Sequence, residues 1–289
     1  MVRVLVEEGG ADVNHAQSAD GFSPLGCAAQ EGHAKIVRLL LEAGADIHHV
    51  VKDGRNSLFM PSQKGHVQVV RELIAAGIDV NNVWPENGST ALFVAAQEGH
   101  AEAVRLLLEA GADINDLTKD GRNALYLPSQ FGHVQVVREL IAAGINVNHV
   151  WPETGTTALF VAAQNGHLEV VRLLLEAGAD IHHVVNDGRN TLYLPSQLGH
   201  VQVVRELIAA GINVNHVSPR TGTTALIFAA DRGHAEVVRL LLEAGADPRV
   251  VDLEDDTPLA CAKRNKHAAV VALLEAKLRV LGEDCPPSA

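Results

Sequence analysis

Histidine is the residue type in this sequence best suited to chemistry, because imidazole binds metals and titrates near pH 6.5. The chain has 15 histidines. Eight of them recur at steps of 33 or 34 residues: His33, His66, His100, His133, His167, His200, His234 and His267. Metal ligands must lie about 2.0–2.2 Å from one ion, whereas a repeat wide enough for a helix moves each histidine on by ~10 Å. The spacing therefore predicts a structural ladder, with no metal site and no cofactor.

A second column of histidines also follows the period: His15, His49, His149, His183 and His216. His48 and His182 precede two of them. Consecutive residues of an extended segment point to opposite sides, so such pairs are poor joint ligands. The column could instead give a binding surface a pH-dependent edge. His149 and His183 are therefore candidates for contact with a protein partner.

Catalytic groups are not recognisable in this sequence. No serine or cysteine lies in a nucleophile turn, and no GxxxxGK or GxGxxG pattern follows a strand. The carboxylates recur with the period, which indicates a scaffold rather than one active site. Cys27, Cys261 and Cys285 share no close spacing with histidine, which is typical of a reducing compartment. We predict that the protein is not an enzyme.

Charge and composition restrict the partner and the compartment. The formal net charge is −12, whereas binding to nucleic acid or to an anionic membrane requires a basic face. We therefore expect a monomer that binds a protein with a neutral or basic surface. Glutamates interrupt the N-terminal apolar run, and no segment approaches the roughly 20 apolar residues of a membrane span. The expected location is the cytoplasm, with the nucleus as the alternative.

Two short helices are readable in each repeat, as in "TTALFVAAQNGHLEVVRLLLEAGADI". Thr157 can cap the first helix, which ends at Gly166. The second helix follows His167, has apolar residues at helical spacing and ends at Gly178. The segment "ADIHHVVNDG" then combines strand-forming residues with an Asp-Gly turn. Because so small a helix pair cannot bury its own apolar face, neighbouring repeats must stack.

The period, the "GH" between the helices and the "LLLEAGADI" segment closely resemble the ankyrin repeat family. The resemblance implies an all-α solenoid of helix-turn-helix units with short β-hairpin fingers. It implies one domain over residues 1–282, with an N-terminal half-repeat over 1–18 and eight repeats over about 19–282, of which the last is a C-terminal cap. Residues 283–289 are expected to be a disordered tail. The family binds proteins on a concave face of fingers and first helices and has no intrinsic catalytic site.

The sequence departs from the family in the "TPLH" tetrapeptide, whose histidine is absent from every repeat. Five aromatic residues stand in its place in consecutive repeats: Phe59, Phe93, Tyr126, Phe160 and Tyr193. Packing of these rings between repeats can replace the hydrogen bonds of the missing histidine. A partly exposed aromatic strip that faces a ligand is the alternative.

The alternation of 33 and 34 residues indicates that the duplicated unit is a pair of repeats 67 residues long. We term repeats that read "TTALFVAAQNGH" type A and those that read "RNTLYLPSQLGH" type B. Asn190 in type B holds the capping position of Thr157 in type A. A proline follows where it costs a helical bond, at about 3 kcal/mol: Pro61, Pro128 and Pro195. Either the helix kinks at the proline, or it begins later, so that the proline lies in its first turn, where a missing N–H costs no helical hydrogen bond. The alternative without a functional role is one tolerated substitution that was copied by duplication.

The finger that leads from type B to type A carries a tryptophan in two of three copies, Trp84 and Trp151, and Ser218 in the third. Exposed tryptophan is enriched at binding hot spots, although each ring could also fold back over its own hairpin. Charged residues recur in the same turns and could orient a partner: Glu86 and Glu153 in type A fingers, and Arg55, Arg122 and Arg189 in type B fingers. Arg220 breaks this pattern. Solvated turn residues are the alternative explanation.

The sequence thus predicts a non-enzymatic scaffold for protein–protein interaction, with Trp84 and Trp151 as anchors. A structural spacer within a longer repeat protein is the alternative, because near-identical copies favour length over a specific surface.

Overall fold

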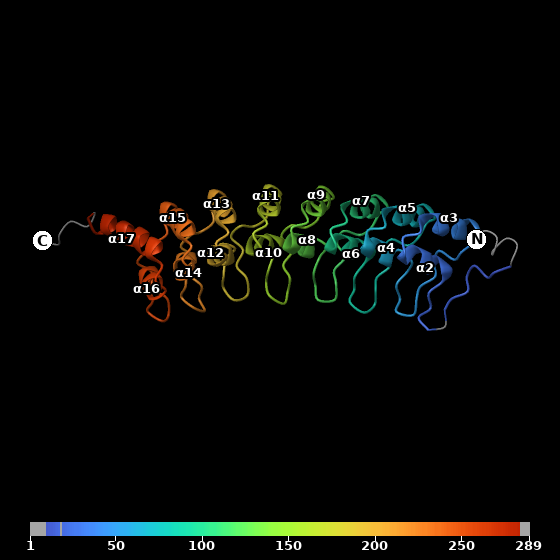
Figure 1. Cartoon of the computed structure of the whole chain (residues 1–289), viewed down its shortest axis with the longest axis horizontal. Coiled ribbons are helices and arrows are strands. Elements are labelled where there is room, and N and C mark those ends of the chain that lie inside the picture. The colour runs from blue at the N-terminus through green and yellow to red at the C-terminus, as the bar shows by residue number, and fades with distance from the viewer. Residues whose placement is uncertain (1–9, 18, 284–289) are drawn as a thin grey trace. The chain divides into compact units, whose positions relative to one another are not determined.

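The computed structural model describes residues 10–17 and 19–283. Within them, sixteen helices form eight consecutive pairs (Figure 1). The first helices of the pairs are α2 (Pro24–Gln30), α4 (Phe59–Lys64), α6 (Ala91–Gln97), α8 (Tyr126–Phe131), α10 (Ala158–Gln164), α12 (Tyr193–Leu198), α14 (Ala225–Arg232) and α16 (Pro258–Arg264). The second helices are α3 (Ala34–Glu42), α5 (Val67–Ala75), α7 (Ala101–Glu109), α9 (Val134–Ala142), α11 (Leu168–Glu176), α13 (Val201–Ala209), α15 (Ala235–Glu243) and α17 (Ala268–Glu283). The half-repeat expected over 1–18 is described only in part, and the tail expected over 283–289, with Cys285, lies outside the described residues apart from Glu283 at the end of α17.

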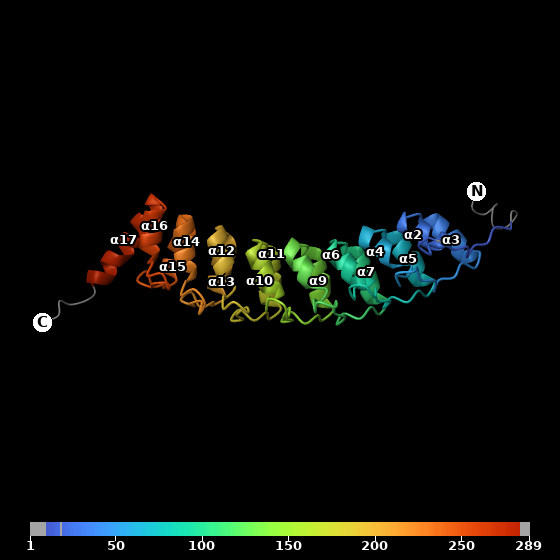
Figure 2. The same ribbon diagram turned by 90° about the horizontal axis from the view of Figure 1, so that it is seen from below.

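The chain divides into two compact units, Met1–Pro128 with His133–Asn146, and Ser129–Gly132 with Val147–Ala289. Within each unit, neighbouring repeats stack. In the first unit α4 contacts α2 and α6, and in the second α14 contacts α12 and α16. First helices form one layer of a unit and second helices the other, while the segments that join successive pairs, here called fingers, project from the first-helix side (Figures 1 and 2).

The core of each unit lies between the two helix layers. The second helices bury valines and leucines at helical spacing, such as Val104 and Leu107 in α7 and Leu174 in α11, all fully buried. The first helices of type A repeats bury alanines beside one leucine and one larger side chain, such as Leu92, Phe93 and Ala95 in α6. Because these side chains touch neighbouring helices on several sides, replacing one buried leucine by alanine would cost about 2–5 kcal/mol.

Threonine caps start the first helices of type A repeats as predicted. The Oγ1 atom of Thr157 accepts a hydrogen bond from the backbone N–H of Phe160 at 3.3 Å, and that of Thr90 accepts one from Phe93 at the same distance. A threonine at this position satisfies one of the free N–H groups of the first helical turn.

The first helices of type B repeats begin late, which decides between the two outcomes left open for the prolines. α12 begins at Tyr193, so Pro195 is its third residue, and Pro61 has the same place in α4. A proline in the first turn removes an N–H that has no helical partner in any case. The predicted capping role of Asn190 is wrong: Leu192 is the N-cap residue.

The asparagine of type B repeats instead joins two successive fingers. Asn190 Oδ1 accepts a hydrogen bond from the N–H of Leu192 at 3.1 Å, while its Nδ2 atom donates to the carbonyl oxygen of Asn213 in the next finger at 3.1 Å. Asn56 makes the same two contacts, with Leu58 at 3.0 Å and Asp79 at 2.7 Å. Its short amide side chain therefore replaces the first helical turn with a link between two fingers.

The periodic histidines between the helices form the predicted structural ladder. His100 Nε2 lies 3.0 Å from the carbonyl oxygen of Gln63, and His200 Nε2 lies 3.1 Å from that of Gln164. Each ring lies against the glycine of the preceding "GH" pair: a Cβ atom on Gly65 would come within 2.5 Å of His100 Nδ1. Gly65 has a φ of 71°, so both its backbone and the neighbouring ring favour glycine there.

The fingers contain isolated antiparallel bridges rather than strands in the described part of the chain: Val50–Asn56, Trp151–Thr156 and Val184–Asn190. Successive fingers within a unit are joined by backbone hydrogen bonds, such as Lys119 N to Asn87 O at 2.8 Å and Leu253 N to Thr221 O at 3.1 Å. The predicted all-α helical repeat fold is confirmed, with the expected hairpins reduced to these bridges.

Candidate functional site

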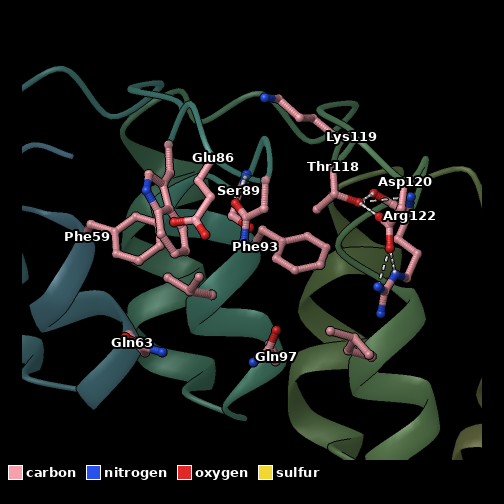
Figure 3. Close-up of a pocket in the computed structure, with 14 residues that line it drawn as sticks. Phe59, Gln63, Glu86, Ser89, Phe93, Gln97, Thr118, Lys119, Asp120 and Arg122 are labelled. Atoms are coloured by element: carbon pink, nitrogen blue, oxygen red, sulfur yellow. Dashed lines mark hydrogen bonds and ion pairs between the residues drawn. The ribbon is translucent and has the colours of Figure 1, made fainter. Parts of the chain in front are cut away.

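An open groove lies in the first unit between two fingers and the first helices behind them. Its volume is about 390 Å³. Aromatic side chains of three elements line it, Phe59 from α4, Trp84 from a finger and Phe93 from α6 (Figure 3). We call it the Trp84 groove. Phe59 and Phe93 are buried, so they form its floor.

Trp84 is fixed against the preceding repeat rather than projecting from its finger. Its ring meets that of Phe59 edge to face, with centroids 5.4 Å apart. The guanidinium carbon of Arg55 lies 4.8 Å from the Trp84 centroid and 5.3 Å from that of Phe59. The indole Nε1 atom is buried without a hydrogen-bond partner among the described residues. The ring is therefore held by stacking and by the cation, and it forms a rigid wall of the groove.

Polar side chains complete the Trp84 groove at its two ends. Gln63 and Gln97 extend from the first helices, and Lys119 lies on the opposite finger (Figure 3). Glu86 is exposed on the finger that carries Trp84. Primary amides can donate and accept hydrogen bonds, so the two glutamines suit a peptide backbone. Lys119 and Glu86 carry opposite charges, so together they favour one direction of a bound segment.

The arginine of this groove is already paired inside its own finger. Arg122 Nε donates to Asp120 Oδ2 at 2.7 Å, and Asp120 also accepts from Thr118. Burial alone would raise the pKa of Asp120, but the hydrogen bonds from Arg122 and Thr118 outweigh it and lower that pKa. The pair fixes the shape of the finger and leaves little net charge for a ligand.

The other predicted arginines have the same surroundings. Arg55 Nε donates to Asp53 at 2.9 Å, and Arg189 Nε donates to Asp187 at 2.8 Å. Each arginine hydrogen bond lowers the pKa of its aspartate. The three arginines are thus half-buried, and each is paired with an aspartate of its own finger.

The remaining predicted residues lie in the second unit or at its border. Trp151 is half-buried and its N–H donates to Thr156 O at 2.8 Å, while Glu153 is exposed on the same finger. His183 Nε2 lies 2.6 Å from the carbonyl oxygen of Gly155, which joins two fingers. His149 is half-buried in its finger. Of the predicted residues, Trp84, Glu86 and Arg122 line the Trp84 groove, and Arg55 lies behind its wall.

A second groove, of about 360 Å³, lies in the second unit between the last two fingers. All but one of its lining residues stand 134 positions after a residue of the Trp84 groove. Its apolar part includes Ile227, Phe228 and Leu253. Four acidic residues line it: Asp231, Asp252, Glu254 and Asp256. Arg220 and Arg264 are its cations. We call it the Leu253 groove.

The sequence interpretation missed several groove residues, namely Phe93 as floor, Gln97, Lys119 and the whole Leu253 groove. The period itself contained a signal for them. Gln97 belongs to a glutamine column that precedes each "GH" pair and changes to Asp231 and Arg264 only in the last two repeats. A position that is glutamine in most repeats and charged in the last ones indicates a surface position whose chemistry differs at one end of the array.

Metal and membrane chemistry find no support in the described part of the chain. No three histidine, cysteine or acidic side chains there could hold a metal ion. Among the same residues, no helix is long and apolar enough to cross a membrane.

Comparison with known families gives one result. A family model described as "Ankyrin repeats (3 copies)" matches the chain over residues 1–51, 44–118, 114–184, 150–218 and 192–284. These matches overlap and together run from residue 1 to residue 284. No curated protein matches the sequence.

Proposed function

Because the chain belongs to the ankyrin repeat family, as its repeats predicted, we propose that it binds a partner protein on the face made by its fingers and first helices. Ankyrin repeats are generally protein–protein interaction modules and are typically not enzymes. The observation that carries the proposal is the Trp84 groove: an aromatic floor, two amides and an open volume of about 390 Å³ on that face. We treat residues 1–282 as the binding domain.

The chemistry of the Trp84 groove favours an extended neutral segment of the partner. Rings that are already fixed lose little conformational freedom when they are covered, so Trp84 can anchor an apolar side chain. Gln63 and Gln97 can bond the segment's backbone. Trp151 is the corresponding anchor in the next copy of the finger. Further contacts are proposed for the remaining candidates: Glu86, Glu153, Arg55, Arg122, Arg189, His149 and His183.

The alternative is a spacer without a dedicated partner. The segment "VQVVRELIAAGI" is identical in three copies, at 67–78, 134–145 and 201–212, which recent duplication for length would explain. A spacer places no demand on groove residues, so a substitution in the Trp84 groove would change no binding.

Selection from a displayed library of random linear peptides on the full chain tests the proposal. We expect recovered peptides to share an apolar position and to lose about tenfold or more in affinity for a Gln97→Arg variant, because the longer side chain fills the groove. Gln68→Arg is the matched control, since it makes the same change at an exposed position of α5, in the second-helix layer away from the groove. Peptides without a shared pattern, or equal affinity for both variants, would favour the spacer.

A further inference from the structure

The Leu253 groove carries negative charge that its own residues leave unbalanced. Arg264 pairs with Asp256 and lies 3.9 Å from Asp231, so this cation is already engaged. No cation of the described chain forms an ion pair with Asp252 or Glu254. Asp255, exposed beside Glu254, is also without such a pair. The finger "DLEDD" (252–256) therefore presents three carboxylates without an ion pair beside one leucine. Asp252 Oδ1 accepts hydrogen bonds from the backbone N–H groups of Glu254 and Asp256, at 2.9 and 3.0 Å.

Arg220 does not neutralise this finger. It lies on the opposite finger of the groove, and its positive charge contributes to the lowered pKa of Asp187, after the larger effect of the Arg189 hydrogen bond. Asp187 belongs to the preceding finger. The field of Arg220 is thus shared with another carboxylate, and the excess of negative charge in the groove remains.

An apolar surface accompanies these charges. Leu253 is 72% exposed, the highest value among the exposed large apolar residues of the described chain. Phe228 lies half-buried below it in the groove, held edge to face against Tyr193 at 5.5 Å. At the position of Leu253 the Trp84 groove has Lys119. A single exposed leucine is common on protein surfaces, but Leu253 lines a groove together with Ile227 and Phe228, so the three form one apolar surface.

The backbone of this finger also departs from the other fingers. Asp255 has a φ of 60°, whereas the equivalent positions are glycines, Gly54, Gly121 and Gly188, with φ values of 90°, 83° and 85°. A left-handed aspartate is less favourable than glycine, so the extra carboxylate is present in spite of a small strain.

We propose that the Leu253 groove binds a basic segment of a partner protein, with lysine or arginine side chains beside Asp252 and Glu254 and an apolar side chain packed on Leu253. Charge complementarity selects this ligand: the groove and the chain, at −12, both attract cations. A metal ion does not fit, since the described acidic side chains do not converge on one position. This second site has a different ligand from the Trp84 groove and does not depend on it.

Fluorescence polarisation on the full chain tests this site. The probe is a labelled peptide with a central leucine flanked by two arginines and two lysines, and its counterpart has glutamates in place of the four basic residues. We expect the basic peptide to bind at about 0.05 M NaCl and more weakly at about 0.3 M, because surface charges are screened by salt. The acidic peptide should not bind.

Two sets of variants separate the groove from the overall charge. The double variant Glu254→Gln, Asp255→Asn should weaken binding about fivefold or more. The matched control Glu42→Gln, Glu98→Gln removes the same charge from exposed positions of the first unit and should change affinity less than twofold by comparison. Leu253→Lys, which installs the residue found at 119, should weaken binding by about tenfold. Circular dichroism verifies that each variant is folded.

Several outcomes would overturn the proposal. One is that the basic peptide does not bind the unmodified chain at low salt. Another is that both double variants weaken binding equally, which would assign the attraction to net charge alone. A third is equal binding of the acidic peptide. Gln97→Arg should leave this binding unchanged, so failure here is distinguishable from failure of the Trp84 groove.

Discussion

The Trp84 groove and the Leu253 groove share a backbone and differ in the side chains that it carries. In both, one residue of the later finger donates its backbone N–H to the preceding finger, Lys119 in one and Leu253 in the other. Both are closed behind by the first helices. The same hydrogen-bonded frame therefore holds a groove with balanced charge in one place and an acidic groove in another.

The two grooves differ in charge at several equivalent positions, and one pair of these lies within the finger turn. Asp120 and Arg122 form an ion pair in the first groove, whereas Glu254 and Asp256 occupy these positions in the second. The finger keeps its shape because Asp256 recruits Arg264 from α16. In a repeat protein the contacts that fix the frame and those that face a ligand are thus separable, and ligand preference changes without a change of fold.

Trp84 in the first unit corresponds to Ser218 in the second, and a substitution at this position should have the largest effect on stability. Trp84→Ser, which installs the residue found at Ser218, removes the stacking partner of Phe59 and Arg55. We expect the free energy of unfolding to fall by about 2–4 kcal/mol, measured by urea denaturation. Trp84→Phe is the control: it keeps a ring and removes the unpaired indole N–H, so it should cost much less. Equal losses would show that stacking does not hold this wall.

Substitutions at two equivalent positions of the finger turns should change the stability of the chain in opposite directions. Gly188→Ala introduces a Cβ atom at a φ of 85° and within 2.6 Å of Pro219 Cδ, and we expect a loss of about 2 kcal/mol. Asp255→Gly relieves a left-handed aspartate and should add about 0.5–1 kcal/mol. Thermal denaturation of the two variants beside the parent chain measures both. A destabilised Asp255→Gly variant would mean that this carboxylate contributes to the fold.

The smallest effect should be a dependence of stability on pH in the Trp84 groove. The pKa of Asp120 is lowered in the folded chain, so its stabilising contribution is present above the pKa of the unfolded chain and is lost as pH falls through the lower, folded value. Asp120→Asn should therefore reduce stability at neutral pH, by less than about 1 kcal/mol because the side chain is partly exposed and screened. It should also flatten the acid limb of the stability curve.

The fold was predictable because one period repeats every local signal. Thr157 as a cap and His167 after the turn were each read correctly, since capping and helix spacing are local properties of the chain. The late start of α12 remained an open alternative, because Asn190 fits both a cap and a turn. Its hydrogen bond to Asn213, 23 residues later in the next finger, decides between the two, and such a contact is not a local property of the chain.

The sites were less predictable than the fold for a related reason. Trp84 and Glu86 were found from residue type alone, and both line a groove. Arg122 was read as a surface charge because its pairing with Asp120 depends on how the finger turns. Leu253 has no signal in its own repeat, because its exposure depends on the finger before it. The pairing of Arg122 and the exposure of Leu253 both depend on how the fingers fold, so the sequence of one repeat alone does not predict them.

The asparagine link of type B repeats has a consequence for how such an array changes length. Asn56 and Asn190 each donate to a backbone carbonyl oxygen 23 residues later, so donor and acceptor belong to the same repeat. Any residue at the acceptor position supplies that oxygen. A type B repeat therefore carries the contacts that set its own helix start, and arrays that gain or lose a single repeat should keep them.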